Sequence, residues 1–285
     1  MSDTVSDHRL VALHRRYGAD EAERVGARID PSLWNDVLAV QLAHRSVRKF
    51  LPERVSEDHL RVIVAAASSA ASSSNLQLWS VIAVTDRERL GRIAELAGNQ
   101  ETVRNAPLLL VWVADLARAA RLATRRGRDL VNVDYLESAL LGIVDATLAA
   151  QNAALAAESF GLGTVYIGAL RDHPTELASE LALPDHSFAV VGLVVGRPDP
   201  AGYPEVKPRL GQDVVLHREQ YGSGAEDAED EGVAAYEDAI AQFYRGQDLP
   251  DSWSERVLGR FASPGALGHR EGLRQALLQR GFGLD

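Results

Sequence analysis

The amino-acid sequence predicts an α+β fold, in which helices alternate with short buried strands. Two near-continuous apolar runs, Leu108–Ala114 and His186–Val195, are short and bounded by Pro107 and Gly196, which is typical of buried strands. A much longer Ala-rich run, from about Tyr135 to Ser159, predicts a buried helix. Shorter helical patterns lie between these segments, and the sequence contains no internal repeat.

The first elements are expected to be helical. Residues 1–40 predict a helical extension with apolar positions such as Leu13, which we expect to pack against the core or across a dimer. A helix over Asp58–Ala67 follows, with Ser56 as a suitable N-cap because its hydroxyl can accept a first-turn N–H. Alternating β-formers over Trp79–Val84 then predict a strand.

The central elements continue the alternation. Asp86–Ala97 predicts a helix that ends at Gly98, a residue suited to a left-handed C-terminal position. Gly161 and Gly163 follow a helix and lead into a strand at Thr164–Ile167. In a dinucleotide-binding fingerprint the glycines instead follow a strand and open a helix. The two glycines therefore predict a tight turn and not a phosphate-binding loop.

Beyond Pro198 the composition changes. Prolines stiffen the next segment, and five acidic residues between Glu226 and Glu231 predict a solvated linker. Helices are expected over Val233–Phe243 and within Ser252–Gln279. An arm with so little core of its own suggests packing on a partner subunit. We therefore predict three parts: an N-terminal extension (1–40), a core (41–200) and a C-terminal arm (201–285).

Composition excludes several classes of function. The 285 residues include no cysteine, which rules out disulfides, thiolate metal sites and thiol nucleophiles. The sequence has no HExxH pair for a metal and no G-x-S-x-G nucleophile elbow, so no metal is expected. A net charge of −10 discourages nonspecific nucleic-acid binding. What remains is chemistry carried by a bound cofactor.

The same composition suggests a cytoplasmic protein without membrane partners. The first thirty residues are charged throughout, so no signal peptide is visible. The apolar run from Tyr135 carries polar residues such as Glu137 and Asp145, which argue for a helix buried in protein instead of a membrane span.

Two basic segments far apart in the sequence suit a bound phosphate. His44-Arg45-Ser46-Val47-Arg48 and Lys207-Pro208-Arg209 together supply four cations, an imidazole and a hydroxyl. An arginine presents a planar fork of donors that matches phosphate oxygens, and a lysine adds a compact charge. We therefore expect both segments to hold the phosphate and polar part of a cofactor.

Three further polar segments lie between the two basic segments. They are Ser72-Ser73-Ser74-Asn75-Leu76-Gln77, Gly98-Asn99-Gln100, and the run from Glu158 to Gly168. In order and spacing, the whole set resembles the nitroreductase superfamily of FMN enzymes. The likeness is strongest to its oxygen-insensitive NADPH nitroreductase and NADPH–flavin reductase branch, and it runs from about Gln41 to Tyr221.

The resemblance implies both a fold and an activity. The fold would be nitroreductase-like, with a central, mostly antiparallel sheet flanked by helices, in a domain-swapped homodimer with exchanged C-terminal arms. The activity would be that of an FMN-dependent oxidoreductase working by a ping-pong mechanism. Hydride would pass from NADPH or NADH through flavin N5 to a small-molecule acceptor, such as a nitroaromatic, a quinone or a flavin.

The resemblance also implies residue roles. The ribityl chain and phosphate of FMN would be held by His44, Arg45, Ser46, Arg48 and Arg209. Lys207 and Gln100 would lie at the pyrimidine edge of the flavin, where the lysine charge tunes the ring. Hydroxyls would come from the other subunit's Ser72, Ser73 and Ser74. The main chain beside the ring would be that of Tyr166, Ile167, Gly168, Ala169 and Leu170.

Nicotinamide recognition departs from the family pattern. Glu137 matches an acidic residue near the carboxamide, although a glutamate at a helix N-terminus is equally consistent with favourable interaction with the helix dipole. Arg245 lies where relatives bind the 2′-phosphate of NADPH, but Leu249-Pro250 replaces a common pair of arginines. The preference between NADPH and NADH therefore stays open.

Two other functions remain compatible with these residues. Ala169 stands where the family often has a second glycine, which restricts approach to the ring slightly. With the extension and the missing arginines, this leaves room for an FMN-binding protein without efficient turnover, serving storage, sensing or interaction. A third possibility retains FMN for other chemistry, such as flavin fragmentation or dehalogenation.

Overall fold

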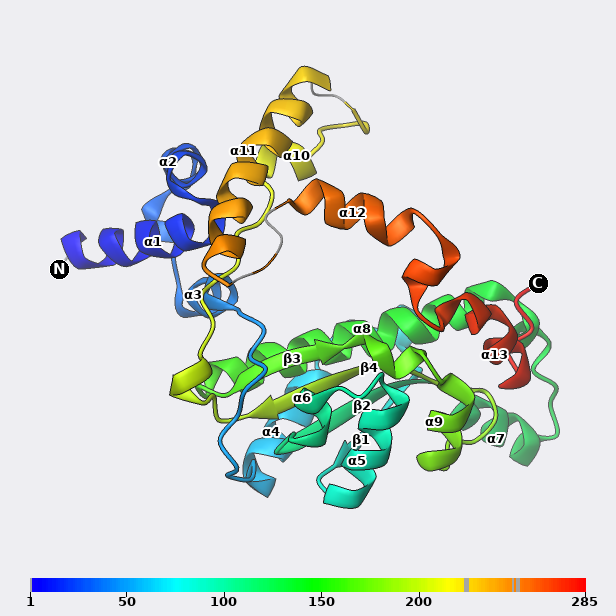
Figure 1. The fold of residues 1–285 in the computed structure, drawn as a ribbon. Helices are drawn as coiled ribbons and strands as arrows, with labels where there is room; N and C mark the ends of the chain where they lie inside the picture. The colour runs from blue at the N-terminus through cyan, green and yellow to red at the C-terminus, as the bar shows by residue number, and fades with distance from the viewer. Residues whose placement is uncertain (1, 223–225, 248, 250–251) are drawn as a thin grey trace. The chain divides into compact units, whose positions relative to one another are not determined.

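Figure 1 shows the fold, taken from a computed structural model. The structure describes residues 2–222, 226–247, 249 and 252–285. The chain forms two compact units. The helical unit comprises Met1–Arg45 and Glu205–Ala266, and the sheet unit comprises Ser46–Pro204 and Leu267–Asp285.

The sheet unit contains a four-stranded antiparallel sheet in the order β1-β2-β4-β3. Its strands are β1 (Trp79–Val84), β2 (Leu108–Asp115), β3 (Gly163–Ile167) and β4 (Ser187–Gly196). The central pair, β2 and β4, aligns Leu108 with Val195, and the register shifts between Trp112 and Val113. β1 and β3 are the two edges, so they lie on opposite sides of the sheet.

Helices cover both faces of this sheet, as Figure 1 shows. One face carries α4 (Glu57–Ser68) and the long α8 (Leu136–Ser159), which contacts all four strands. The other face carries α5 (Arg87–Leu96), α6 (Glu101–Arg104) and α9 (Pro174–Glu180). The remaining helices of this unit are α7 (Ala117–Arg126) and α13 (Leu273–Gln279).

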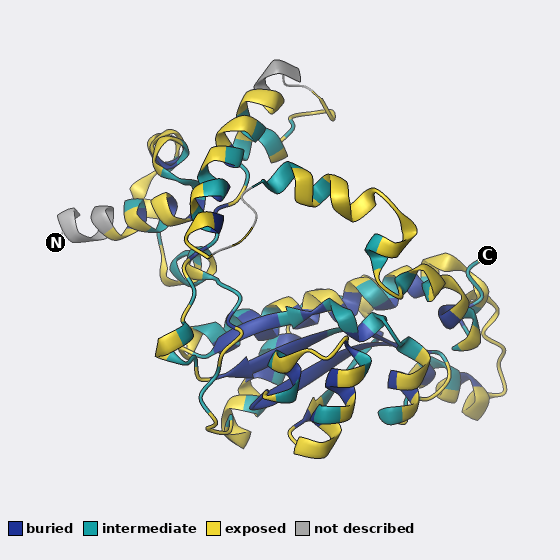
Figure 2. Ribbon diagram, viewed as in Figure 1, coloured by how far each residue is buried: buried dark blue, intermediate teal, exposed yellow. Residues whose placement is uncertain are grey.

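The alternation of side chains along β2 explains why both faces are covered. Odd-numbered residues of β2 pack with Leu90 and Ile93 of α5, and even-numbered ones pack with Ala149 and Ala153 of α8. Every residue of β2 is buried, and Figure 2 shows the strands as the buried centre of the unit. The predicted α+β fold, with a mostly antiparallel sheet flanked by helices, is confirmed.

Helix α8 is the core helix of the sheet unit. By length and composition alone it could span a membrane, but 44% of its most apolar window is buried inside the fold. Small side chains such as Ala146, Ala149 and Ala153 form the buried face, which lets the helix approach the sheet closely. This burial agrees with the helix predicted from the sequence.

The helical unit begins with a pair of packed helices, α1 (Ser2–Tyr17) and α2 (Ala19–Arg28), followed by α3 (Asp36–Ala43). Leu13, Ala22 and Val25 form its buried core, with Leu42 of α3 packed against them. A Cβ at Gly26 would lie 3.0 Å from Leu10, so glycine allows α1 and α2 to pack closely. The N-terminal residues thus form a helical hairpin that packs on α3, and their role as an extension stays a prediction.

The second part of the helical unit contains α10 (Gln212–Val215), α11 (Glu226–Arg245) and α12 (Trp253–Phe261). The acidic run from Glu226 to Glu231, predicted to be a linker, is helical instead and opens α11. The prediction was wrong because acidic residues are favoured in the first turns of a helix, where they interact with its dipole. Ser252 caps α12 by accepting a hydrogen bond from the Glu255 N–H.

The two units cut across the three predicted parts of the chain. Their boundaries lie at 45/46, 204/205 and 266/267, near the predicted divisions at 40 and 200. The last nineteen residues belong to the sheet unit and not to the unit that contains α11 and α12. The predicted division into extension, core and arm stays a prediction about function and assembly.

Candidate functional site

The two basic segments meet, in the helical unit, at one buried arginine. Arg16, in the last turn of α1, is only 6% exposed. Its guanidinium donates to the carbonyls of His44 (2.7 Å), Leu42 (2.8 Å) and Lys207 (2.8 Å), while its own carbonyl accepts from the Arg209 N–H (2.8 Å). His44 is the C-cap of α3 and Arg45 follows it directly. The structure therefore brings His44, Arg45, Lys207 and Arg209 together.

The donors of these segments fit a phosphate. The backbone carbonyls of His44 and Lys207, which would repel an anion, are both turned to the Arg16 guanidinium. Arg48 and Arg209 hydrogen-bond only to nearby carbonyls, those of Ser46, Lys207 and Pro208. Among the described residues neither arginine forms an ion pair with a carboxylate. An arginine without an ion-pair partner is suited to bind an added anion such as a phosphate.

The segment from Ser46 to Phe50 is fixed at the edge of the sheet. Ser46 forms a parallel bridge with Thr164 of β3, and the Val47 N–H donates to the Thr164 carbonyl (2.9 Å). Val47 is buried, and a Cβ at Gly163 would lie 2.8 Å from it. The second glycine of the predicted turn therefore permits this close approach. Ser46 and Arg48 are held beside β3.

The other end of β3 gathers the residues expected at the flavin ring. After Ile167 the chain turns through the 3₁₀ helix Gly168–Arg171, and Ile167 and Leu170 are buried. The turn at Gly98 reaches the same place, because a Cβ at Gly98 would lie 3.8 Å from Asp172 Oδ2. This turn delivers Gln100, which is exposed at the start of α6.

Tyr166 lies within the same strand, on the face of α8. Burial raises the pKa of its phenol, and the negative charge of Glu158 raises it further. The hydroxyl donates weakly to Gln151 of α8 (3.4 Å). Tyr166 therefore stays neutral at physiological pH and anchors the strand to α8.

The three serines form a strained loop before β1. Ser74, Asn75 and Gln77 all have positive φ, between 49° and 55°, a region that non-glycine residues rarely adopt. The buried carboxylate of Asp145 in α8 fixes this loop by accepting from the Ser72 hydroxyl (2.7 Å) and from the Leu78 N–H (3.0 Å). The serine loop is thus held against α8 and is not free to move.

Within the sheet unit the serines lie apart from Ser46 and from the turn after Ile167. They precede β1, whereas Ser46 is bridged to β3 and the turn after Ile167 follows β3, and two strands separate these edges. Adjacent strands are about 4.8 Å apart, so the two edges are separated by about 14 Å.

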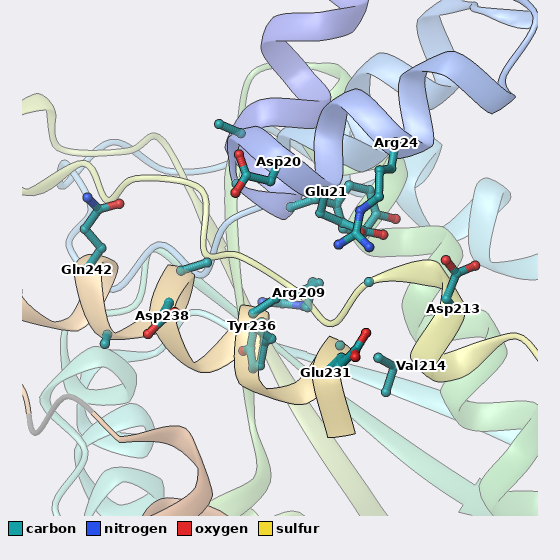
Figure 3. Close-up of a pocket in the computed structure, with 18 of the residues that line it drawn as sticks. Asp20, Glu21, Arg24, Arg209, Asp213, Val214, Glu231, Tyr236, Asp238 and Gln242 are labelled. Carbon is teal, nitrogen blue, oxygen red and sulfur yellow. The ribbon is translucent and has the colours of Figure 1, made fainter. Parts of the chain in front are cut away.

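Arg209 also lines a pocket of about 650 Å³ in the helical unit. In Figure 3 it lies between Glu21 and Arg24 of α2 on one side and Tyr236 of α11 on the other. The lining carries five carboxylates (Asp20, Glu21, Asp213, Glu231, Asp238) and three guanidinium groups (Arg24, Arg209, Arg245). This excess of negative charge does not suit a phosphate, so the pocket itself is not an anion site.

The residues expected near nicotinamide lie in different units. Glu137 is exposed in the first turn of α8 in the sheet unit, and Arg245 ends α11 in the helical unit. Lys207, expected at the flavin edge, places its ammonium 5.5 and 5.4 Å from the ring centroids of Phe243 and Tyr244. Of the segment where relatives carry arginines, Leu249 is exposed, and Pro250 and Asp251 lie outside the described residues.

Comparison with known proteins identifies the family. Residues 42–197 match the nitroreductase family, and residues 207–285 match the C-terminal domain of the nitroreductase family. The chain belongs to the nitroreductase family. The match to the core begins two residues before His44, and the match to the C-terminal domain begins at Lys207, so both basic segments lie within the family region.

Nitroreductase-family relatives of known name include reductases from several bacteria. The chain is 37% identical to the NADPH-flavin oxidoreductase of Vibrio harveyi over 80% of this chain and 92% of that protein. It is 41% identical to an FMN reductase [NAD(P)H] of Bacillus subtilis, over 73% of this chain and 83% of that protein. An oxygen-insensitive NADPH nitroreductase of Salmonella typhimurium is 37% identical to this chain, over 75% of this chain and 86% of that protein.

Solved structures of this family share the fold. The hypothetical oxidoreductase YcnD from Bacillus subtilis has a TM-score of 0.82 at 35% identity, over 88% of this chain and 100% of that chain. The NADPH:FMN oxidoreductase from Vibrio harveyi, in complex with NAD⁺, has a TM-score of 0.75 at 35% identity, over 87% of this chain and 99% of that chain. The family resemblance inferred from the sequence is confirmed.

Sequence reasoning missed three buried charged residues, Arg9, Arg16 and Asp145, although the sequence carries a signal for each. Arg9, Leu13 and Arg16 are spaced by four and three residues, which puts both arginines on the buried face of α1. Asp145 follows Gly142 by three residues and precedes Ala149 by four, on the buried face of α8. Within the described residues, no group of three or more His, Asp or Glu side chains is arranged to hold a metal.

Proposed function

We propose that this chain is an FMN-dependent NAD(P)H oxidoreductase that reduces small acceptors such as flavins, quinones or nitroaromatics. When bound, FMN would supply the hydride-transfer chemistry between a reduced nicotinamide and the acceptor, in a ping-pong cycle. The observation that carries the proposal is the junction at Arg16, where both basic segments of a nitroreductase-family chain contact one guanidinium.

The phosphate would be held by the side chains of His44, Arg45, Arg48 and Arg209, with the Ser46 hydroxyl beside them. His44–Arg45 and Lys207–Arg209 lie close together, which supports this assignment. Ser46 directly follows Arg45 in the chain and is anchored at β3. Arg48 and Arg209 have no carboxylate partner among the described residues. Each charge-assisted hydrogen bond to the phosphate would contribute about 1.5–3 kcal/mol.

The ring would lie against the turn that ends β3. The missing side chain of Gly168 permits close approach of the main chain, with Ile167, Ala169 and Leu170 on either side. The Gln100 amide would donate to and accept from the pyrimidine edge. Lys207 would place a cation at the same edge, where it favours the negatively charged form of the reduced ring.

The active form would be a homodimer in which Ser72, Ser73 and Ser74 reach the site of the partner subunit. Their position at the opposite edge of the sheet from Ser46 supports this, because one chain alone does not bring them together. Leu136, Leu140, Val144 and Leu148 repeat every four residues along α8 and are 42–50% exposed. A second copy packed on this apolar stripe would remove it from water.

Discrimination between NADPH and NADH would be weak. Arg245 lines an acidic pocket, and the exposed Leu249 offers no charge to a 2′-phosphate. Glu137 stays a candidate for the nicotinamide carboxamide. A cytoplasmic location is consistent with a supply of both nicotinamides.

Anaerobic mixing of the FMN-loaded protein with NADPH or NADH tests this function. Rapid bleaching of the flavin absorbance, followed by its return on addition of a quinone or a nitroarene, is the expected result. Retained FMN that neither nicotinamide bleaches at high concentration would instead establish an FMN-binding protein without turnover. Protein that binds no FMN would overturn both.

A further inference from the structure

Two arginines in the α1–α2 hairpin are buried, and they bind different parts of the chain. Arg9, 6% exposed, donates to the carbonyls of Gly26 and Ile29, so it joins α1 to the end of α2. Arg16, equally buried, donates outside the hairpin, to the carbonyls of Leu42, His44 and Lys207. Burying a guanidinium is costly unless its donors are satisfied, so Arg16 holds its acceptors firmly in place. The Nε of Arg9, by contrast, is buried without a hydrogen-bond partner among the described residues.

The contacts of Arg16 are arranged to set backbone positions. One nitrogen, Nη2, spans the carbonyls of Leu42 and His44 at the end of α3, and Nη1 reaches the Lys207 carbonyl. The Arg16 carbonyl accepts from the Arg209 N–H, which fixes the second segment a second time. A planar guanidinium cannot make these contacts unless His44 and Lys207 keep a set distance and direction.

The hairpin is rigid enough to serve as a support. Leu13 and Val25 are almost fully buried, and Leu42 of α3 packs against the same cluster. Arg16 therefore extends from a packed helix and not from a flexible arm.

We propose that Arg16 is a positioning residue for FMN, by which the N-terminal hairpin holds the two phosphate-binding segments in register. This inference rests on the proposed function and assigns to the hairpin a role in cofactor retention. Arg16 itself does not touch the cofactor. It acts through the backbone of His44 and Lys207, whose neighbours Arg45 and Arg209 bind the phosphate.

Equilibrium titration of the apoprotein with FMN and with riboflavin, which lacks the phosphate, tests this role. Three variants are compared with the natural chain: Arg16→Met, Arg16→Lys and the matched control Arg9→Met, each checked for folding by circular dichroism and thermal melting. We expect Arg16→Met to raise the Kd for FMN about tenfold or more, while the Kd for riboflavin changes less than about twofold. Arg16→Lys should give a smaller loss with the same selectivity, because one ammonium cannot span all three carbonyls.

Arg9→Met should lower the melting temperature but leave the ratio of the FMN and riboflavin affinities unchanged. Equal loss of both ligands in the Arg16 variants, or the same selective loss in Arg9→Met, would show that Arg16 merely stabilises the fold and would overturn the inference. If Arg16→Met fails to fold, the selectivity of Arg16→Lys decides. If the natural chain binds neither ligand, the proposed function fails. If the natural chain binds FMN and the Arg16 variants bind it equally well, only the inference about Arg16 fails.

Discussion

Individual residues decide whether this chain retains a phosphate-bearing cofactor. Arg48 and Arg209 come from segments about 160 residues apart, and neither has a carboxylate partner among the described residues. A guanidinium that is already neutralised gains little from a new anion, whereas these two would gain a full charge-assisted interaction. Asp145 has the opposite character, because its carboxylate already accepts hydrogen bonds from the Ser72 hydroxyl and from the Ser73 and Leu78 N–H groups.

Replacing either arginine should release FMN without unfolding the chain. Arg48→Ala or Arg209→Ala is expected to weaken FMN binding about tenfold or more, the equivalent of one charge-assisted hydrogen bond. Flavin retained after gel filtration of a dilute sample measures the effect. Arg61→Ala, which removes an exposed arginine paired with Glu57 in α4, is the control. Stoichiometric flavin in both arginine variants would remove them from the phosphate.

Loss of the Asp145 carboxylate should loosen the serine loop. Asp145→Ala leaves the Ser72 hydroxyl and the Ser73 and Leu78 N–H groups without their acceptor, so we expect the free energy of unfolding to fall by about 3 kcal/mol. Urea denaturation measures this. Thr147→Ala, which removes a hydroxyl bonded only within α8, should cost far less. Equal losses for the two variants would mean that the loop does not depend on Asp145.

At the scale of elements, periodicity predicted most of what the structure contains. β1 matches the predicted Trp79–Val84, and α8 begins one residue after the predicted Tyr135, because long apolar patterns and strong turn residues specify such segments. The start of α11 was misassigned since a run of acidic residues is compatible with both a linker and a helix N-terminus. Sequence alone does not separate these, because packing decides between them.

The apolar stripe of α8 should hold two chains together. Leu140→Glu places a charge in the middle of that stripe, so we expect the protein to elute as a monomer with reduced FMN content. Light scattering coupled to gel filtration gives the mass. Leu122→Glu changes a similarly exposed leucine on α7 and should leave the mass unchanged. A dimer that survives Leu140→Glu would place the interface elsewhere.

The clamp between α5 and α9 should make stability depend on pH. Glu180 of α9 pairs with Arg92 (2.9 Å) and Arg89 (3.2 Å) of α5, and the Arg92 hydrogen bond holds the pKa of Glu180 below its usual value of 4.5. A lowered pKa in the folded state contributes stability above the ordinary value, and this contribution is lost as pH falls through the folded value.

Glu180→Gln should therefore melt at a lower temperature than the natural chain near pH 7, and the difference should shrink below pH 4.5 as the natural glutamate is protonated. Melting curves over a pH series measure it. A difference that stays constant down to acidic pH would show that the carboxylate charge contributes nothing.

For the whole molecule, the sequence predicted the class of fold, which the structure confirms, whereas the residues of the candidate site stay predictions. The His44–Arg48 and Lys207–Arg209 segments carry their chemistry in their residue types, so the sequence alone predicts that they bind a phosphate. The spacing in α1 places Arg16 on the buried face, but its role depends on its acceptors at Leu42, His44 and Lys207, which lie far away in the sequence. The strained serine loop was equally hidden, since its positive φ angles arise from contacts with a distant helix.

Titration of the folded, cofactor-free protein with FMN tests the central claim most directly. Convergence of the two basic segments predicts one FMN per chain, bound at least about tenfold more tightly than riboflavin because the phosphate adds charge-assisted hydrogen bonds. The preference should decline as salt screens those charges. Equal affinity for FMN and riboflavin, or no binding of FMN by correctly folded protein, would contradict it.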